Sequence, residues 1–357
     1  MRPKILVIYN EPVLPASHPD AASEHDIVET SATIAELIAE CGYDASRIGF
    51  STDPSVLLDR LRIDPPDAVF NLFEGLANRT ATEISVAALL EWLDVPFSGS
   101  PSTAIALGRD KIRTKYLLQA AGLPTSAFAV AYEPGPVHWA GPWPVIVKPA
   151  CQDSSVGIEQ ASVVSNRSEL EERVAAVLDA FGPPVLIEEF IGGREFHVNM
   201  RDVPDDDGQP SVRELIPLAE IRFDYEPGRT LWPIYSFDAK WNVTSEEYLS
   251  TPLDTPVILP EALMDRIRTL TLATWRLLGL RDYARLDVRL CKNGDPYILE
   301  VNPNPYLCSI ALTRGLEAMG RTHREMIHDI VRLTLGRSQV SSIPRRHRAE
   351  DTTKQSA

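Results

Sequence analysis

Runs of apolar residues with two different periods divide the first hundred positions of the chain. Residues 5–9 and 67–71 are short stretches rich in apolar side chains, as expected of strands buried in a parallel sheet. Between them, residues 27–41 place apolar side chains at helical spacing, and Gly42 follows as a stop. Residues 82–93 form a second helical stretch. Strands that alternate with helices predict an α/β layer built on a parallel sheet.

The middle of the chain follows a different pattern. Residues 142–149 and 184–191 predict two further strands, and residues 168–181 predict a helix between them. Residues 203–211 combine Pro, Asp and Gly, which predicts an exposed hairpin tip. Residues 222–256 are polar and rich in proline and aromatic residues, and a connection of that length usually covers a functional site.

The last third of the chain returns to clear periodicity. Residues 260–278 predict a helix, and residues 282–291 and 296–301 predict two strands joined by a turn at 292–294. One more helix is expected to end near residue 332 or 335. The tail 338–357 is polar and is expected to be disordered.

A carboxylate interrupts the apolar run of the last predicted strand. Burying Glu300 among apolar side chains requires a partner or a metal, because an uncompensated buried charge is costly. Glu300 and Asn302 share one face of their strand, as Arg285 and Asp287 do on the preceding strand. If the hairpin is in register, Asp287, Glu300 and Asn302 form a set of oxygen ligands suited to Mg²⁺ and completed by phosphates. The alternative is a surface hairpin with solvated charges, which the apolar surroundings of Glu300 disfavour.

Two lysines can add contacts to phosphate. Lys111 opens a helix, and Lys148 ends a strand just before the small-residue loop 152–157. Either lysine can bind phosphate oxygens as a point charge, although each taken alone would more often be an ordinary surface lysine. The loop can offer backbone N–H groups and hydroxyls, but it is not a Walker sequence. Residues 188–191 either end a strand or present a carboxylate and backbone groups to an adenine edge.

Composition limits the remaining classes of function. A chain of 357 residues suggests two or three domains. Its net charge of −15 argues against a general nucleic-acid or anionic-membrane binder. The four cysteines are scattered without a CxxC pair, so neither a disulfide framework nor a zinc site is expected. No apolar run reaches the length of a signal-peptide core or a membrane span, and we expect a cytoplasmic protein.

The order of these motifs resembles the ATP-grasp fold, and within it the D-alanine–D-alanine ligases. The resemblance covers about residues 3–335. It is carried by Asp110-Lys111, residues 145–149 with the following Ser154 and Ser155, residues 186–190 with Glu195, Arg285 with Asp287, and Glu300 with Asn302.

The resemblance implies an α/β (α+β) protein of three domains. The N-terminal domain would be Rossmann-like, with a parallel sheet over residues 1–105. Residues 106–192 would form the central ATP-grasp lid domain and residues 193–337 the C-terminal catalytic domain, followed by the tail 338–357.

Carried onto this sequence, the resemblance also implies an ATP site. Two lysines would contact the phosphates, and the loop with Ser154 and Ser155 would close over them. Glu188 would bond the adenine amino group, and Glu195 would hold the ribose. The implied nucleotide residues are Lys111, Lys148, Ser154, Ser155, Glu188, Glu189, Ile191 and Glu195, of which Glu189 and Ile191 offer backbone contacts.

The same resemblance implies the metal and the catalytic groups. Asp287, Glu300 and Asn302 would bind two Mg²⁺ ions, with Mn²⁺ as an alternative. The region 222–256 would act as a lid that excludes water, and it carries Lys240, which would reach the γ-phosphate. The implied catalytic residues are Arg285, which would stabilise the tetrahedral intermediate, Lys240 and Ser154.

The sequence departs from the dipeptide ligases around the substrate positions. Asp26 resembles the residue that receives the first amino acid's ammonium group. Tyr306 stands in place of the usual glycine, and Ala311 in place of a serine that holds the second carboxylate. Trp241 replaces a lid tyrosine, and residues 70–75 replace a His-Gly segment. Asp26, Tyr306 and Trp241 are therefore the candidate substrate residues.

The leading hypothesis is an ATP-dependent ligase that joins a carboxylate to an amine through an acyl phosphate. Its substrates would be small molecules, either amino acids or small peptides, and not nucleic acid or membrane. The first alternative is a D-alanine–D-alanine ligase of cell-wall synthesis. An ATP-binding regulator without turnover is an alternative of another class, and a kinase on the same fold is a further one. Dimers are common among similar ligases, so a homodimer is compatible with the resemblance.

Overall fold

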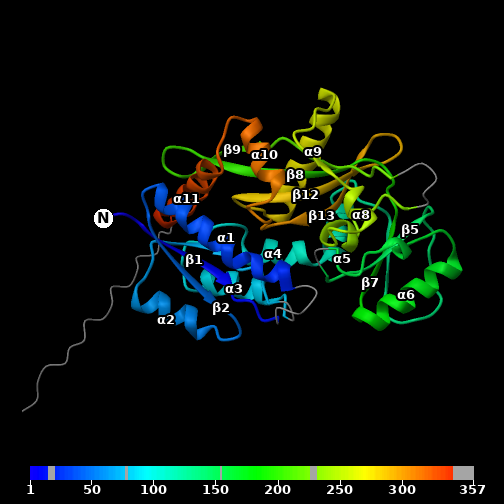
Figure 1. Ribbon diagram of the computed structural model, residues 1–357, viewed down its shortest axis with the longest axis horizontal. Coiled ribbons are helices and arrows are strands. Elements are labelled where there is room, and N and C mark those ends of the chain that lie inside the picture. The colour runs from blue at the N-terminus through cyan, green and yellow to red at the C-terminus, as the bar shows by residue number, and fades with distance from the viewer. Residues whose placement is uncertain (15–20, 77–78, 153–154, 226–230, 341–357) are drawn as a thin grey trace, which may run out of the picture.

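The computed structural model describes residues 1–14, 21–76, 79–152, 155–225 and 231–340 (Figure 1). Three sheets follow one another along the chain. They span residues 4–72, 128–189 and 195–302. The predicted domain boundaries at 105/106 and 192/193 fall between the sheets and stay predictions.

The first sheet is parallel, as predicted, with the strand order β2-β1-β3. Its central strand is buried on both faces, because Leu6 packs with α2 and α3 while Val7 packs with α1 and α11. The elements are β1 (Lys4–Asn10), α1 (Ala21–Glu40), β2 (Asp44–Phe50), α2 (Ser55–Ile63), β3 (Ala68–Leu72), α3 (Thr82–Trp92) and α4 (Ser102–Arg109).

The second sheet is antiparallel, with the order β4-β7-β5-β6. Helix α6 covers one face through Leu170, Val174 and Val177. The side chain of Asn166 caps the start of this helix by accepting the N–H of Glu169. The elements are α5 (Lys111–Ala120), β4 (Phe128–Ala131), β5 (Val145–Pro149), the 3₁₀ turn η1 (Gln160–Ser162), β6 (Val163–Val164), α6 (Arg167–Phe181) and β7 (Val185–Glu189).

The third sheet has the order β11-β10-β8-β12-β13, and β9 pairs with β8 from outside that path. The β8–β9 hairpin confirms the predicted exposed tip. The elements are β8 (Glu195–Pro204), β9 (Pro210–Leu215), β10 (Ala219–Ile221), α7 (Phe237–Trp241), α8 (Glu246–Leu249), β11 (Leu253–Asp254), α9 (Glu261–Leu278), β12 (Tyr283–Leu290), β13 (Pro296–Asn302), α10 (Ile310–Ala318) and α11 (His323–Val340).

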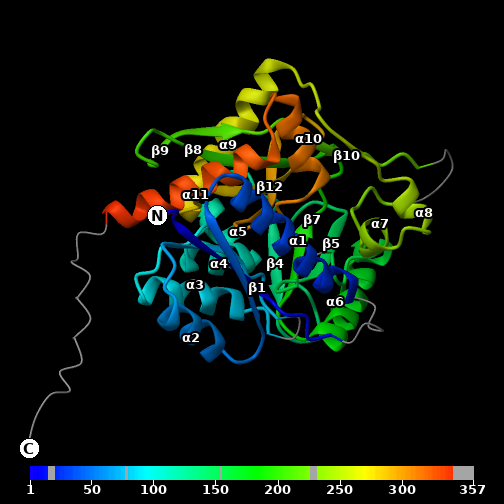
Figure 2. The same ribbon diagram turned by 60° about the vertical axis from the view of Figure 1, so that its left-hand side comes forward.

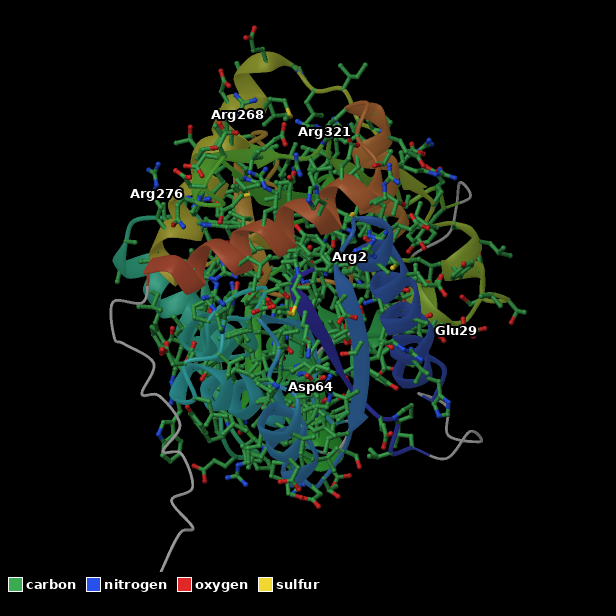
Figure 3. All side chains as sticks on the ribbon, turned by 90° about the vertical axis from the view of Figure 1, so that its left-hand side faces the viewer. Arg2, Glu29, Asp64, Arg268, Arg276 and Arg321 are labelled. Atoms are coloured by element: carbon green, nitrogen blue, oxygen red, sulfur yellow. The ribbon has the colours of Figure 1, made fainter. Side chains whose placement is uncertain are left out.

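Helix α9 covers the apolar face of this third sheet. Its buried stripe includes Ile267, Leu270 and Trp275, while Arg268 and Arg276 point outward from the other side of the helix (Figure 3). This amphipathic pattern follows from the helical period of the sequence. No helix in the described part of the chain combines the length and the apolar composition that a membrane span requires.

Helix α11 corrects one prediction. The sequence placed its end near residue 332 or 335 and the disordered tail from 338, but the helix continues to Val340. The last turns are held by tertiary contacts, because the Arg337 guanidinium lies 2.8 Å and 2.9 Å from the two carboxylate oxygens of Asp282. The remainder of the predicted tail, residues 341–357, lies outside the described residues.

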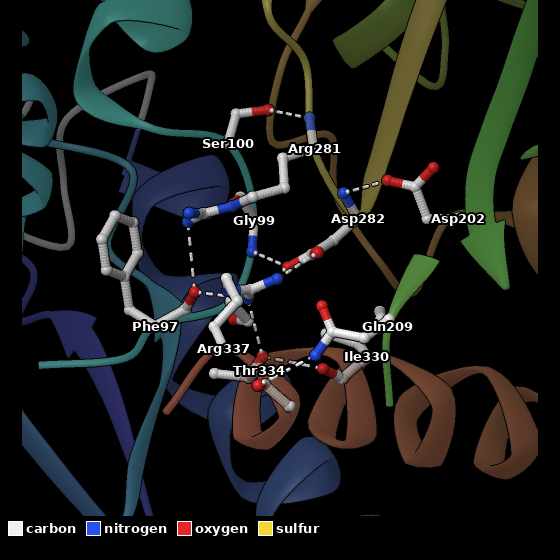
Figure 4. Close-up of polar contacts among 12 residues, drawn as sticks. Phe97, Gly99, Ser100, Asp202, Gln209, Arg281, Asp282, Ile330, Thr334 and Arg337 are labelled. Atoms are coloured by element: carbon white, nitrogen blue, oxygen red, sulfur yellow. Dashed lines mark hydrogen bonds and ion pairs between the residues drawn. The ribbon is translucent and has the colours of Figure 1, made fainter. Parts of the chain in front are cut away.

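Asp282 joins the first and third sheets through a buried polar network (Figure 4). Its carboxylate accepts the backbone N–H of Gly99 at 2.8 Å in addition to the Arg337 pair. Its own backbone N–H donates to Asp202 at 3.0 Å. The neighbouring Arg281 donates to the Gly99 carbonyl at 2.6 Å. These contacts tie the segment after the first sheet to β12 and α11, and so fix how the two sheets meet.

We expect Asp282→Asn to lower the free energy of unfolding by about 3 kcal/mol, because it removes the buried anion that pairs with Arg337. Asparagine tolerates the positive φ of 62° at this position, so the change isolates the loss of charge. Urea unfolding measures the effect. The matched control is Asp295→Asn, which removes an exposed pair with Arg266 and should cost less than about 1 kcal/mol. Equal losses in the free energy of unfolding for the two variants would contradict the role of Asp282 in holding the two sheets together.

Candidate active site

The face of the third sheet opposite α9 carries the candidate site. Because side chains alternate along each strand, Leu286 and Val288 point into the core while their neighbours point the other way. A β-bulge after Asp287 keeps that residue opposite Glu300. The polar face consists of Glu195, His197 and Asn199 of β8, Arg285, Asp287 and Arg289 of β12, and Glu300 and Asn302 of β13.

The register confirms the predicted hairpin. Asp287 lies opposite Glu300 on one side and His197 on the other, and Arg285 lies opposite Asn302. Arg285 donates two hydrogen bonds to Asp287, from Nε to Oδ1 at 2.8 Å and from Nη2 to Oδ2 at 3.1 Å. Burial alone would raise the pKa of Asp287, but Arg285 and His197 outweigh it and lower the pKa. The carboxylate is therefore an anion held next to a fixed cation.

Lys111 connects this face to the second sheet. Its ammonium lies 2.8 Å from Glu300 and donates to the carbonyl of Gln152 at 2.6 Å. Glu300 is thus compensated, as a carboxylate within an apolar strand requires. A cation between two carboxylate-bearing strands and the small-residue loop is well placed to meet phosphate oxygens.

A second group of charges is buried in the second sheet. Glu188 is only 2% exposed and forms ion pairs with both Lys115 and Lys148. Ser126 donates to its carboxylate at 2.9 Å, and Thr125 accepts from Lys115 at 2.8 Å. Burial would raise the pKa of Glu188, but the two lysines overcome that effect and lower it to about 2. Burial lowers the pKa of Lys115, and Glu188 opposes the change.

The predicted lid contacts the small-residue loop. Ser155 donates its hydroxyl to the Tyr235 carbonyl at 2.8 Å, and the N–H of Phe237 donates to the Ile158 carbonyl at 3.0 Å. Figure 2 shows α7 and α8 beside this part of the second sheet. The Lys240 ammonium lies 5.2 Å from the ring centre of Trp241. Lys240 also adds to the positive charges that act on Asp287.

Two of the predicted substrate residues, Asp26 and Tyr306, meet beside a pocket at the carboxyl end of the first sheet, whereas Trp241 lies on α7 in the predicted lid and does not line this pocket. The hydroxyl of Tyr306 lies 3.2 Å from that of Thr30 and hydrogen-bonds with Asp26. Burial raises the pKa of Tyr306, and Asp26 raises it further. Asn71 and Glu74 line the same pocket. Ligands of open parallel sheets bind at this end of the strands.

The structure therefore places the candidates in three neighbouring groups. The polar face holds Arg285, Asp287, Glu300 and Asn302 with Lys111, and Lys148 lies with Glu188. Glu189 donates its backbone N–H to Ala127 at 2.9 Å, and Ile191 is buried. Ser154 lies outside the described residues.

Sequence reasoning missed several residues of these groups, among them Lys115, His197, Arg289 and Ser126. Lys115 lies one helical turn after Lys111, a spacing that could have revealed it. His197 and Arg289 each stand two positions from a predicted residue on the same strand, so strand alternation could have revealed them. Ser126 gives no such signal, because the bend of the chain between α5 and β4 decides where it lies.

The residues of the polar face fit a magnesium–nucleotide complex. Among the described residues, no group of three or more His, Cys, Asp and Glu side chains converges as a metal site. The candidate set contains only two carboxylates, those of Asp287 and Glu300, together with the amide oxygen of Asn302. It is therefore a partial set of hard oxygen ligands. Such a set suits Mg²⁺, which keeps waters and takes substrate phosphates as ligands.

Comparisons with known proteins decide the family. The family model described as "D-ala D-ala ligase C-terminus" matches residues 117–332. A D-alanine–D-alanine ligase of Alcanivorax borkumensis is 33% identical over 277 residues, which is 75% of this chain and 81% of that protein. The chain belongs to the D-alanine–D-alanine ligase family. The predicted resemblance and ATP-dependent ligase activity that forms carbon–nitrogen bonds are thereby confirmed.

Two other similar proteins extend the comparison. An uncharacterised protein of Sinorhizobium fredii is 29% identical and covers 84% of this chain and 85% of its own length. The crystal structure of a D-alanine–D-alanine ligase from Bacillus anthracis complexed with ATP covers 94% of this chain and 99% of its own, with a TM-score of 0.69 and 20% identity. That similarity confirms the ATP-grasp fold of this D-alanine–D-alanine ligase family member.

We expect Glu188→Gln to lower the free energy of unfolding at pH 7 by about 3 kcal/mol, because two buried lysines lose their shared anion. The folded pKa of about 2 lies below the ordinary value of 4.5. Glu188 therefore contributes its full stability above about pH 4.5 and loses it as the pH falls towards 2. Urea unfolding of the wild type and of Glu188→Gln should show that the difference between their free energies of unfolding becomes smaller from pH 7 to pH 3.

The control for this experiment is Glu172→Gln on the exposed side of α6. It should change neither the stability at pH 7 nor its pH dependence. A difference between wild type and Glu188→Gln that stays constant down to pH 3 would contradict the assignment.

Proposed function

We propose that this enzyme joins the carboxylate of one amino acid or small peptide to the amine of another, using ATP and Mg²⁺. The observation that carries the proposal is the cross-strand pairing of Asp287 with Glu300, beside Arg285 and Lys111 on one face. An acyl phosphate needs these groups, since phosphoryl transfer depends on positioning and on neutralising charge.

The nucleotide would lie between the second and third sheets. Lys111 and Lys148 would contact its phosphates, and Glu195 its ribose. Glu188 would meet the adenine amino group, next to the backbone of Glu189 and Ile191. The burial of Lys148 and Glu188, together with the position of Lys111 at the small-residue loop, supports these roles.

Asp287, Glu300 and Asn302 would hold two Mg²⁺ ions, and Mn²⁺ offers the same oxygen preference. These residues would hold ions that, when bound, would supply charge neutralisation for the phosphates and orientation of the γ-phosphate. The ion pair with Asp287 already holds Arg285 in the site. Arg285 would therefore stabilise a developing oxyanion without having to move.

The reaction divides into two steps. A carboxylate oxygen of the first substrate attacks the γ-phosphorus, the bond to ADP breaks, and an acyl phosphate forms. The amine nitrogen of the second substrate then attacks the acyl carbon, phosphate leaves, and the amine loses a proton to give the amide. Lys240 and Arg285 would stabilise the charge at the two centres. The lid would exclude water, which otherwise hydrolyses the acyl phosphate.

The first substrate would bind near Asp26, whose carboxylate suits an ammonium group. Tyr306 closes over this carboxylate through its hydroxyl, and Ala311, which is buried in α10, offers no hydroxyl to a carboxylate. The site around Tyr306 thus favours substrates other than two D-alanines. The names of the ligase relatives favour D-alanyl-D-alanine as the alternative product. A cytoplasmic location and a homodimer belong to the same proposal.

Phosphate release from Mg-ATP with a panel of D- and L-amino acids and dipeptides, singly and in pairs, tests the function. We expect release only with particular pairs, and an amide product that mass spectrometry detects. Release with D-alanine alone would establish the alternative. Tight ATP binding without release would indicate a regulator, and a phosphorylated product without an amide would indicate a kinase.

Glu300→Gln should lower turnover by at least about 10²-fold, because it removes a charge from the metal site. Circular dichroism should show an unchanged fold. The control Glu261→Gln, at the exposed start of α9, should keep full turnover. Turnover near the wild-type rate in Glu300→Gln would place the metal site elsewhere.

Replacing Tyr306 should change substrate choice. Tyr306→Gly removes the ring and should increase kcat/KM for D-alanine about tenfold or more relative to the preferred pair, a difference of about 1.4 kcal/mol. Tyr306→Phe keeps the ring and loses only the hydroxyl that contacts Asp26, so it should raise the affinity for the first substrate, whose ammonium group would bind Asp26, while keeping the order of preference. An unchanged order in Tyr306→Gly would show that the ring does not select the substrate.

A further inference from the structure

Arg289 is a buried arginine on the polar face to which the proposed reaction gives no role. Only 3% of its surface is exposed. It lies opposite Glu195 in the β8–β12 register, with its Nε 3.2 Å from Oε2 of Glu195. Its guanidinium lies over two aromatic rings, at 5.1 Å from the centre of Phe190 and 5.3 Å from that of Phe223. An arginine this buried needs a compensating anion, and its flat guanidinium gains further from stacking on aromatic rings.

The surroundings of Arg289 come from three separate segments. Phe190 belongs to the connection between the second and third sheets, and Phe223 follows β10. Arg289 also donates to the backbone carbonyl of Pro233, in the predicted lid. Trp232 packs edge-on against Phe190 with ring centres 5.6 Å apart. Arg289 thus contacts both the connection between two sheets and the predicted lid through a single side chain.

The contact with Glu195 is a charge pair without a hydrogen bond. Although the Nε–Oε2 distance is short, the N–H is not aimed at the oxygen, and Nε has no hydrogen-bond partner in the described part of the chain. Among the described residues, no donor hydrogen-bonds to the Glu195 carboxylate. Arg289 therefore supplies the compensating charge and leaves the lone pairs of Glu195 available to a ligand.

The charge matters because Glu195 is itself buried, with 8% of its surface exposed. Burial raises the pKa of Glu195, and Asp287 and Glu300 on the same face add to the rise. Arg289 is the strongest influence in the opposite direction, ahead of Lys148. A carboxylate in these surroundings remains a good acceptor only while a cation stays beside it.

We propose that Arg289 is a positioning residue of the nucleotide site: it holds Glu195 and the Trp232–Pro233 backbone so that the carboxylate accepts the ribose hydroxyls of ATP. The inference rests on the proposed ATP site. It makes Arg289 the source of selectivity for ribonucleotides, because a carboxylate held with free lone pairs distinguishes a diol from a single hydroxyl.

Titration calorimetry with Mg-ATP and Mg-2′-deoxy-ATP tests this role without requiring turnover. We expect the wild type to bind ATP about tenfold or more tightly than 2′-deoxy-ATP. Arg289→Met should weaken ATP binding about tenfold. It should also reduce the preference for ATP over 2′-deoxy-ATP to about twofold or less. Because Arg285, Asp287 and Glu300 are untouched, kcat at saturating ATP should stay within about threefold while KM for ATP rises.

Three companion variants complete the experiment. Glu195→Gln should also bind ATP and 2′-deoxy-ATP with similar affinity. The double variant with Arg289→Met should bind ATP only slightly more weakly than either single variant. Arg289→Lys keeps the charge but not the planar stacking, and should lower the ratio at least about threefold. The matched control is Arg194→Met, directly before β8. It removes an arginine that is paired with Glu220 and stacked over Phe196, and it should keep the wild-type ratio of the two affinities.

The outcomes separate this inference from the proposed function. A wild-type ratio retained in folded Arg289→Met, or in Arg289→Lys should the methionine variant not fold, overturns the positioning role. A wild type that binds both nucleotides equally overturns it as well. ATP binding with the expected ratio but without phosphate release on any substrate pair defeats the ligase proposal and supports the role of Arg289.

Discussion

The antiparallel register of β8, β12 and β13 brings a row of ionisable groups onto one face of a sheet whose other face is apolar core. Side chains at directly opposed positions lie about 5 Å apart, so like charges there would repel strongly. Asp287 and Glu300 form such an opposed pair, and each carboxylate has a cation beside it. Arg285 pairs with Asp287 from the same strand, Lys111 reaches Glu300, and Arg289 lies beside Glu195. Each of these carboxylates thus has a compensating cation from the same strand, a neighbouring strand or another segment.

The same constraint explains why the site lies where three sheets meet. Lys111 comes from the start of α5 and also binds the loop after β5, so the compensation of Glu300 couples two sheets. Glu188 is balanced by lysines from α5 and β5. Next to the first sheet, the Asp282 network fixes the position of the segment around Gly99 relative to α11. Charge compensation across segments thus positions the site and joins the parts of the fold.

The segment 303–306 follows directly from the last metal-ligand candidate and ends in the first sheet's pocket. Asn304 accepts the N–H of Ser100 at 2.8 Å, which fixes the turn before Tyr306 contacts Thr30. In the proposed mechanism, phosphate and metal would be bound from strands, whereas the substrates would be selected by a loop held between two sheets. Such a loop can vary its side chains without disturbing the register of β12 and β13.

The sequence by itself determined the parallel first sheet, the β12–β13 hairpin and the charges on its polar face, because strand alternation and turn residues are local signals. It also indicated Lys111, Lys148 and Glu188, though not that Lys115 shares Glu188 with Lys148. Only the tertiary structure decided that α11 continues past residue 335, since Asp282 holds Arg337 from another part of the chain. Likewise, the burial of Arg289 between Phe190 and Phe223 depends on packing between distant segments. Local periodicity fixes which way a side chain points, and packing fixes what it meets there.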